Sequence, residues 1–269
     1  ENALVLIPVV LVWLVSSIPL PLTLRLQRTA IFLVCASVIP SLVAWRNFIV
    51  CGEWLVTTYQ GGPNFYIGNN PDANGSYVAL SSGRGHTQYE PIDAMRIAEA
   101  AEGRKLSPRE ISGFWYGRAY DFIRSQPMER FRLLLLKSFY LVNHYEIPDS
   151  EDQWFYADHS LVLTVLGPLW HFGLLFPLAV GGFLLLPRRS PEDWLIFFLA
   201  LVFALSTIAF FILARYRYPL VPLLIPFAAG ALSRVVSSRV EEIRRRIGVA
   251  VGVACLAALP ANWPTSFPA

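Results

Sequence analysis

The amino-acid sequence predicts an all-α integral membrane protein, and two observations support that prediction. Of the 269 residues, 55% are hydrophobic and only 15% are charged, whereas soluble domains carry about 25% charged residues. The apolar residues also gather in blocks that are almost free of charge: Asn2–Leu20, Thr29–Trp45, Leu161–Leu186, Trp194–Ala214, Tyr218–Val236 and Ile247–Leu259. Most blocks approach the ~20 residues that a helix needs to cross a bilayer. Because a helix satisfies its own backbone groups in lipid, these blocks predict about six transmembrane helices.

Other global features give little support to competing classes. No charged segment precedes the first apolar block, so that block is not expected to be a signal peptide. Since the sequence begins with Glu1 rather than Met, we expect it to be a piece of a longer protein. Cys35, Cys51 and Cys255 form no disulfide or metal pattern, and a net charge of +3 does not suggest a nucleic-acid partner. No cofactor is predicted.

Arginines in the short connections predict the orientation. They lie between the first and second, third and fourth, and fifth and sixth blocks, as Arg25, Arg28, Arg188, Arg189, Arg234, Arg239, Arg244, Arg245 and Arg246. The positive-inside rule makes these connections cytoplasmic. The chain then divides into two transmembrane helices over 1–45, an extracytoplasmic segment over 46–160, and four helices with a short tail over 161–269. Arg215 and Arg217 fall on the opposite, extracytoplasmic side.

The segment 46–160 is predicted to be mostly helical. Its first part is rich in Gly, Pro and Asn, which favour turns, and these turns flank a short predicted strand, Phe65–Ile67. A helix over Pro91–Glu102 should stop at Gly103. The next has a complete start, with Ser107 as N-cap, Pro108 at the first helical position and Glu110 closing a capping box.

A third helix is predicted from Pro127 to about Tyr145. Its apolar stripe is Phe131, Leu134, Leu135, Phe139 and Val142, interrupted by Arg130, Arg132 and Lys137. We expect this helix to lie in the membrane interface, where the basic side chains reach lipid phosphates.

Four stretches occur in an order that resembles a known family: GGPNFYIGNNPDANGSY (61–77), FIRSQPMERFRLLLLKSFYLVNHYEIPD (122–149), GLLFPLAVGG (173–182) and ARYRYPLVPLLIPFAAGAL (214–232). Together they resemble the C-terminal half of bacterial GT-C glycosyltransferases of family 39 type, the protein-mannosyltransferase and aminoarabinose-transferase type. The resemblance covers nearly the whole chain.

This resemblance implies a bacterial inner-membrane enzyme that takes a sugar from a polyprenyl-phosphate donor. The sugar passes to an extracytoplasmic glycan, lipid or protein acceptor by an inverting displacement. The resemblance places the carboxylate base in a loop upstream of Glu1, so the catalytic base is not expected within this chain.

Three basic residues are candidates for the donor phosphate: Arg215, Arg217 and Lys137. Guanidinium groups can meet the growing charge of a phosphate leaving group with paired hydrogen bonds. Pro219 favours an extended Tyr218, which would present both arginines on one side. Membrane anchoring is the alternative for the arginines, and a stem that reaches the interface is the alternative for Lys137.

A second set of residues suits a sugar. Glu146 could bind a sugar hydroxyl or pair with an arginine. Asn64, Tyr66, Asn69, Asn70 and Asp72 supply amides, a ring and a carboxylate, although tight turns use the same residue types. The acidic run Asp149, Glu151, Asp152, Asp158 and His159 matches no metal-ligand spacing, so no metal is predicted.

Two other function classes remain open. One is a membrane transporter or flippase, and the other is a non-catalytic membrane scaffold that displays 46–160 to a partner. The spans carry no charged residue near their centres, which argues against ion-coupled transport.

Overall fold

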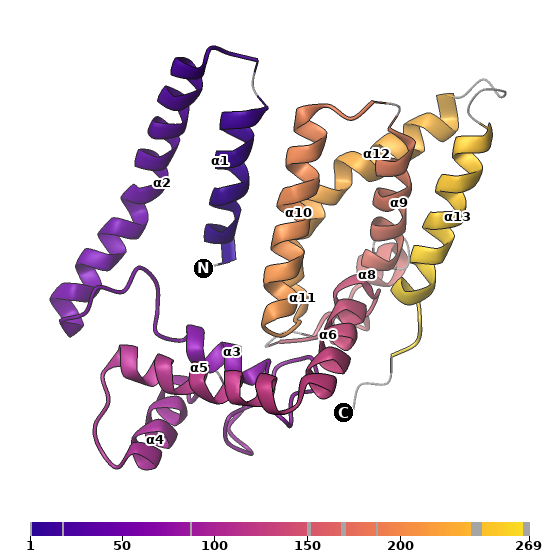
Figure 1. Ribbon diagram of the computed structural model, residues 1–269. Helices are drawn as coiled ribbons and strands as arrows, with labels where there is room; N and C mark the ends of the chain where they lie inside the picture. The colour runs from indigo at the N-terminus through magenta and orange to yellow at the C-terminus, as the bar shows by residue number, and fades with distance from the viewer. Residues whose placement is uncertain are drawn as a thin grey trace. The chain divides into compact units, whose positions relative to one another are not determined.

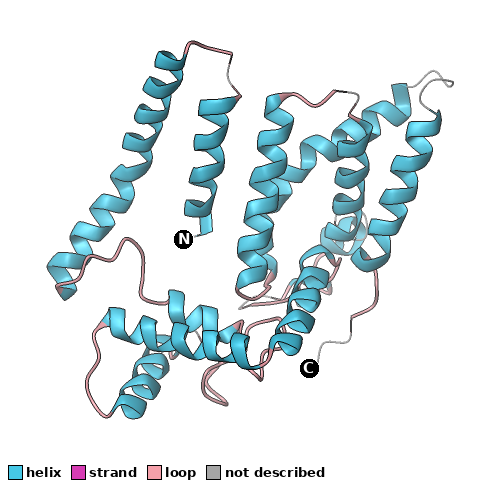
Figure 2. Ribbon diagram, in the orientation of Figure 1, coloured by secondary structure: helices cyan, strands magenta, loops and turns pink. Residues whose placement is uncertain are grey.

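The computed structural model describes residues 2–17, 19–86, 88–149, 152–167, 171–186, 188–237 and 244–265. Helices make up 73% of the structure, and no strand occurs in these ranges (Figure 2). The all-helical prediction is therefore confirmed. Among the described residues, two helices are long and apolar enough to cross a membrane, Leu22–Cys51 and Pro191–Ala209. Shorter apolar helices cover Ala3–Ser16, Phe172–Leu185 and Gly248–Ala261.

The chain forms two compact units. The first comprises Glu1–Leu134 with Ala209–Phe211, and the second comprises Leu135–Ile208 with Ile212–Ala269. The elements of the first unit are η1 (Asn2–Leu6), α1 (Ile7–Ser16), α2 (Leu22–Cys51), α3 (Gly61–Ile67), α4 (Glu90–Glu102), α5 (Pro108–Ser125) and the start of α6 (Pro127–Val142). The elements that follow are α7 (Gln153–Ala157), α8 (Leu161–Leu166), α9 (Phe172–Leu185), α10 (Pro191–Ala209), α11 (Ala214–Arg217), η3 (Tyr218–Leu220), α12 (Val221–Ser237) and α13 (Arg244–Ala261) (Figure 1).

Helices α1 and α2 lie side by side in the first unit (Figure 1). Arg25 and Arg28 were expected in a loop, but both lie within α2, Arg25 at the end of its first turn and Arg28 one turn later. The Arg25 Nε donates to the Leu20 carbonyl at 2.8 Å, and its Nη1 donates to the Val15 carbonyl at 2.8 Å. Arg25 therefore satisfies one carbonyl in the last turn of α1, that of Val15, and one in the connection to α2, that of Leu20.

A small core in the first unit joins α4 to α5. Ala94, Ala98, Ile111 and Trp115 are buried together, and the Trp115 indole donates to the Ala94 carbonyl at 3.1 Å. The predicted start of α5 is confirmed, because both hydrogen bonds of the Ser107–Glu110 capping box are present. The predicted end of α4 is confirmed as well, since Gly103 has a φ of 69°.

The strand predicted at Phe65–Ile67 is wrong, because these residues belong to helix α3. Tertiary contacts with α5 explain the difference. The Gly62 amide donates to Ser112 Oγ at 3.1 Å, and the Tyr66 ring lies 4.8 Å from the Trp115 ring. A helical turn brings both residues to α5, which local turn chemistry does not predict.

In the second unit, α9 packs between α12 and α13 (Figure 1). Glycines allow these close approaches: a Cβ at Gly181 would lie 3.3 Å from the Ala254 Cβ, and one at Gly182 would meet the Phe227 carbonyl. The single helix predicted over Leu161–Leu186 is wrong. This range contains two separate helices, α8 and α9, and the backbone of His171 is extended (φ −129°, ψ 163°) immediately before α9. The extended backbone of His171 is not compatible with one continuous helix over this range.

Candidate functional site

Arg217 is the centre of a polar cluster in the second unit. Its side chain is 2% exposed. The guanidinium forms a fork with Glu146, with Nη2–Oε1 at 2.7 Å and Nε–Oε2 at 3.2 Å. Two parallel N–H···O bonds to a carboxylate are the strongest arrangement that an arginine makes. Glu146 thus takes the arginine-pairing role that the sequence left open.

The same guanidinium also closes the C-terminal end of α6. It donates to four backbone carbonyls, those of Tyr140 at 3.0 Å, Leu141 at 3.3 Å, Asn143 at 2.5 Å and Tyr145 at 2.8 Å. The last carbonyls of a helix have no partner within the helix, and the helix dipole favours a cation there. Arg217 therefore serves as a tertiary cap for α6. Because its donors are already used, it is a structural residue rather than a phosphate ligand.

Two asparagines connect this cluster to the end of the chain. Asn143 is 1% exposed, and its Nδ2 donates to the carbonyls of Pro260 at 3.0 Å and Trp263 at 2.9 Å. Asn262 Nδ2 donates to the Gly173 carbonyl at 2.9 Å. The sequence analysis missed both residues. Their signal was an amide side chain at the end of an apolar helix, where backbone groups need partners.

Arg215 differs from Arg217 in its exposure. Its side chain is 52% exposed, and its Nη1 lies 2.5 Å from Asp149 Oδ2. Its Nη2 donates to the Tyr216 hydroxyl at 3.0 Å. The expected extended Tyr218 is wrong: its φ and ψ are −51° and −39°, so α11 is a single helical turn. That turn directs Arg217 inward and leaves Arg215 accessible.

The segments that carry these residues are held together by their backbones. The Ala214 amide donates to the Ile147 carbonyl at 3.0 Å. Residues 143–149 consequently run beside residues 213–217, which brings Glu146 to Arg217 and Asp149 to Arg215. Nearby, burial and the negative charge of Asp152 raise the pKa of Tyr145, so its phenol stays protonated at neutral pH.

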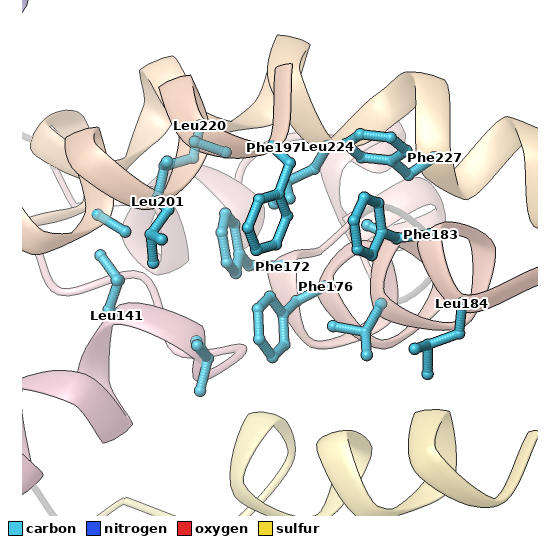
Figure 3. A pocket seen from close by; sticks show the side chains of 15 residues that line it. Leu141, Phe172, Phe176, Phe183, Leu184, Phe197, Leu201, Leu220, Leu224 and Phe227 are labelled. Carbon is cyan, nitrogen blue, oxygen red and sulfur yellow. The ribbon is translucent and has the colours of Figure 1, made fainter. Parts of the chain in front are cut away.

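An apolar cavity of about 230 Å³ lies in the same unit. Its walls come from α9, α10, η3, α12 and the end of α6, and all fifteen lining residues are Ala, Val, Leu or Phe (Figure 3). Two of these lining residues, Leu141 and Phe172, also contact Arg217. The Leu141 carbonyl accepts a hydrogen bond from the Arg217 guanidinium, and the Arg217 Cζ lies 4.8 Å from the Phe172 ring centre. A charged cluster thus adjoins one boundary of an apolar cavity.

Lys137 does not occupy the predicted interfacial position. The side chain is 0% exposed, so its ammonium does not reach solvent or lipid phosphates. The buried face of α6 is Leu133, Lys137 and Leu141, whereas Phe131 and Leu135 of the predicted stripe are more than half exposed. Part of the predicted stripe is therefore exposed, while Leu134, Phe139 and Val142 are partly buried and the lysine faces the protein.

The asparagines proposed for sugar binding lie in the first unit and stabilise its backbone. Asn69 is 0% exposed; its Nδ2 donates to the carbonyls of Phe65 and Ala209, and its Oδ1 accepts from Arg130. Asn70 bonds its own turn, since its Nδ2 donates to the carbonyls of Tyr66 and Ile67. The Asn70 amide therefore stabilises its own turn, whereas Asn69 joins α3 to Ala209 and Arg130.

The other members of that set differ in accessibility. Tyr66 packs on Trp115, whereas Asn64 is half-buried in α3 and Asp72 is exposed. Of the acidic run, Glu151 lies outside the described residues, as does Arg239 among the orienting arginines. Asp149 is the member of that run with an ion pair to a candidate site residue.

Comparisons with protein-family models, with curated proteins and with solved structures find no match to this chain.

Proposed function

We propose that this chain is part of a bacterial inner-membrane glycosyltransferase that uses a polyprenyl-phosphate sugar donor. The observation that carries the proposal is the combination of an accessible arginine, Arg215, with an apolar cavity in the same compact unit. A lipid phosphate has this same combination of an anionic head and an apolar tail. The sequence resemblance to GT-C enzymes supports the same class.

Arg215 is the proposed phosphate ligand. Its side chain is half exposed, whereas Arg217 and Lys137 are buried. Its fixed fork of donors matches phosphate oxygens. As the bond between sugar and phosphate breaks, negative charge grows on the phosphate, and a cation already in place stabilises that charge.

The cavity bounded by α9, α10 and α12 is the proposed site for part of the isoprenoid chain. Its lining has no polar side chain, so an isoprenoid would leave water without burying an unsatisfied group. Each apolar carbon removed from water contributes to binding. The phosphate group and the chain would then be recognised by neighbouring parts of one unit.

Membrane insertion of six helices is part of the proposal. The apolar stretch of α2 is almost wholly exposed in the structure, and an exposed apolar helix of 30 residues is stable in lipid rather than in water. We propose that α1, α2, α9, α10, α12 and α13 span the bilayer. Residues 46–160 would then lie outside the cytoplasm with the acceptor.

The proposed reaction is an inverting displacement at the anomeric carbon. The bond between that carbon and the phosphate oxygen breaks, and the acceptor oxygen forms the new bond. The acceptor proton passes to a base, which we assign to a part of the protein upstream of Glu1. Within this chain, Arg215 binds the leaving group, while Glu146 and Arg217 hold its segment in position.

Transfer from a radiolabelled polyprenyl-phosphate sugar by the native protein containing this chain tests the proposal. Arg215→Ala should lower kcat/KM. The decrease should correspond to a loss of roughly 2–4 kcal/mol of transition-state stabilisation, as for loss of one oxyanion donor. Arg215→Lys should recover only part of this, because lysine keeps the charge but loses the fork. If both variants transfer sugar at the wild-type rate per folded protein, the phosphate role is wrong. Movement of the lipid across vesicles without sugar transfer would instead indicate a flippase.

A further inference from the structure

The Asp149 carboxylate forms an ion pair with Arg215, the residue that would bind the donor phosphate. We propose that Asp149 competes with the lipid-phosphate product for Arg215 and thereby promotes product release. This inference rests on the proposed function and adds a residue that the transfer reaction itself does not require. The contact is short, with Arg215 Nη1 2.5 Å from Asp149 Oδ2.

The structure holds this carboxylate in place. Asp149 follows Pro148, whose ring restricts the backbone, and the Ile147 carbonyl accepts a hydrogen bond from the Ala214 amide at 3.0 Å. The Asp149 side chain is 20% exposed, against 52% for Arg215. The arginine can therefore exchange the carboxylate for another anion while the carboxylate stays nearby.

The pair is not needed to join the two segments. The forked Glu146–Arg217 bond and the four carbonyls bound by Arg217 already hold residues 140–146 against α11. A half-exposed ion pair adds little stability beyond these contacts. The contribution of the Asp149–Arg215 pair to stability is therefore small, and we assign the pair a role in ligand exchange.

The product carries more negative charge than the donor, so Arg215 alone would retain the product. The donor is a phosphodiester with one negative charge. When its sugar–oxygen bond breaks, the electron pair stays on the phosphate oxygen and the acceptor proton goes to the base. The product is a phosphomonoester that approaches two negative charges at neutral pH, since its second pKa is about 6. Without a competitor, Arg215 would hold the product more tightly than the donor.

Asp149 acts more strongly on the product than on the donor, because Coulomb repulsion scales with the charge of the ligand. If repulsion from the Asp149 carboxylate weakens dianion binding on the order of fivefold, the upper end of the range for exposed ion pairs, it weakens monoanion binding only about twofold. The Asp149 carboxylate thus reduces the difference between the affinities of product and donor for the Arg215 site.

Equilibrium binding to the native protein that contains this chain, purified in nanodiscs, provides the test. The two probes are undecaprenyl phosphate and its methyl ester, which keeps the chain but carries one charge. In Asp149→Asn at pH 7.5, the Kd of the monoester should fall on the order of fivefold and that of the methyl ester about twofold. At pH 5, where the monoester also carries one charge, the two changes should be alike. Asp158→Asn, which removes the same charge from an exposed position, is the matched control.

The outcomes separate this inference from the proposed function. Equal changes for both lipids at pH 7.5, or no change for either, would overturn the role of Asp149 and leave Arg215 as a phosphate ligand. If Arg215→Gln binds both lipids as tightly as wild type, the phosphate site is wrong and the inference is overturned with it.

Discussion

Arg217 and Glu146 form a forked ion pair across 71 residues of sequence, with Nη2–Oε1 at 2.7 Å and Nε–Oε2 at 3.2 Å. In the proposed topology Arg217 lies on the side where the positive-inside rule disfavours an arginine, and this ion pair gives a structural reason for an arginine there. Arg217 is not an anchor in the headgroup region, because it is buried against the carbonyls that end α6. Its neighbour Arg215 is the arginine that remains accessible to an anion.

Replacing Arg217 should destabilise the second unit. Arg217→Ala leaves Glu146 and four carbonyls without their donor, and breaking a buried ion pair costs about 3–5 kcal/mol. Arg217→Lys should recover only part of that loss, since an ammonium cannot reproduce the fork. Arg215→Ala is the control and should cost no more than ~1 kcal/mol, as expected for an exposed pair. Thermal unfolding in detergent measures all three, and equal losses for Arg215→Ala and Arg217→Ala would contradict the assignment.

Asn143 should hold the C-terminal residues in place. Asn143→Ala removes the donor to the Pro260 and Trp263 carbonyls, which costs about 1–3 kcal/mol when buried groups lose their partner. Amide hydrogen exchange at residues 261–263 should accelerate while exchange in α10 stays unchanged. Asn74→Ala, at an exposed position, is the control for loss of an asparagine. Unchanged exchange at 261–263 would mean that other contacts hold this segment.

Local signals in the sequence predicted the parts of the fold that depend on neighbouring residues. Ser107, Pro108 and Glu110 identify the start of α5 because a capping box is formed within four residues. Gly103 identifies the end of α4 because the left-handed backbone at that position favours glycine. The apolar blocks likewise predicted most of the long helices, since length and composition are local properties.

Features that depend on distant contacts were not predictable in the same way. The role of Arg217 rests on acceptors 71 to 77 residues away, and an Arg-Tyr-Arg-Tyr sequence does not reveal which arginine is buried. The helix α3 depends on α5, about 50 residues later. Lys137 resembles an interfacial lysine by spacing alone, and only tertiary packing distinguishes the buried face of α6 from its exposed one.

The capping box of α5 should give the first unit a specific dependence on pH. The hydrogen bond from Arg104, followed by that from the Ser107 amide, lowers the pKa of Glu110 from 4.5 to about 2. A carboxylate with a lowered pKa stabilises the fold above its unfolded pKa, and the stabilisation is lost as pH falls through the folded value. The difference in Tm between wild type and Glu110→Gln should therefore be present at pH 6 and disappear near pH 2. Arg104→Gln should reduce that difference at pH 6, and a difference independent of pH would contradict the role of the charge.

Gly62 should be required for the contact between α3 and α5. A Cβ at this position would collide with the Ser112 carbonyl oxygen and lie 2.8 Å from the Ser112 carbonyl carbon and Cα, so Gly62→Ala must separate the two helices. Overpacking of this kind costs about 1–3 kcal/mol. Gly113→Ala is the matched control, because a Cβ there has no neighbour within 4 Å. It should instead stabilise α5 by roughly 0.5–1 kcal/mol, the helix preference of alanine over glycine. Chemical denaturation measures both, and destabilisation by both would indicate that crowding at Gly62 is not the cause.

Residues 46–160 should be accessible from outside the cell, whereas the connection between α9 and α10 should not. This prediction requires α9 to cross the membrane, although it has 14 residues and a length of about 21 Å. Cys35, Cys51 and Cys255 are exposed, so each is first replaced by alanine. A membrane-impermeant maleimide applied to intact spheroplasts should then label Asn74→Cys and spare Ser190→Cys, and permeabilisation should allow both to react. Labelling of both cysteines before permeabilisation would show that α9 does not cross. The reverse pattern would place Arg215 and its acidic partner on the cytoplasmic side, away from an extracytoplasmic acceptor.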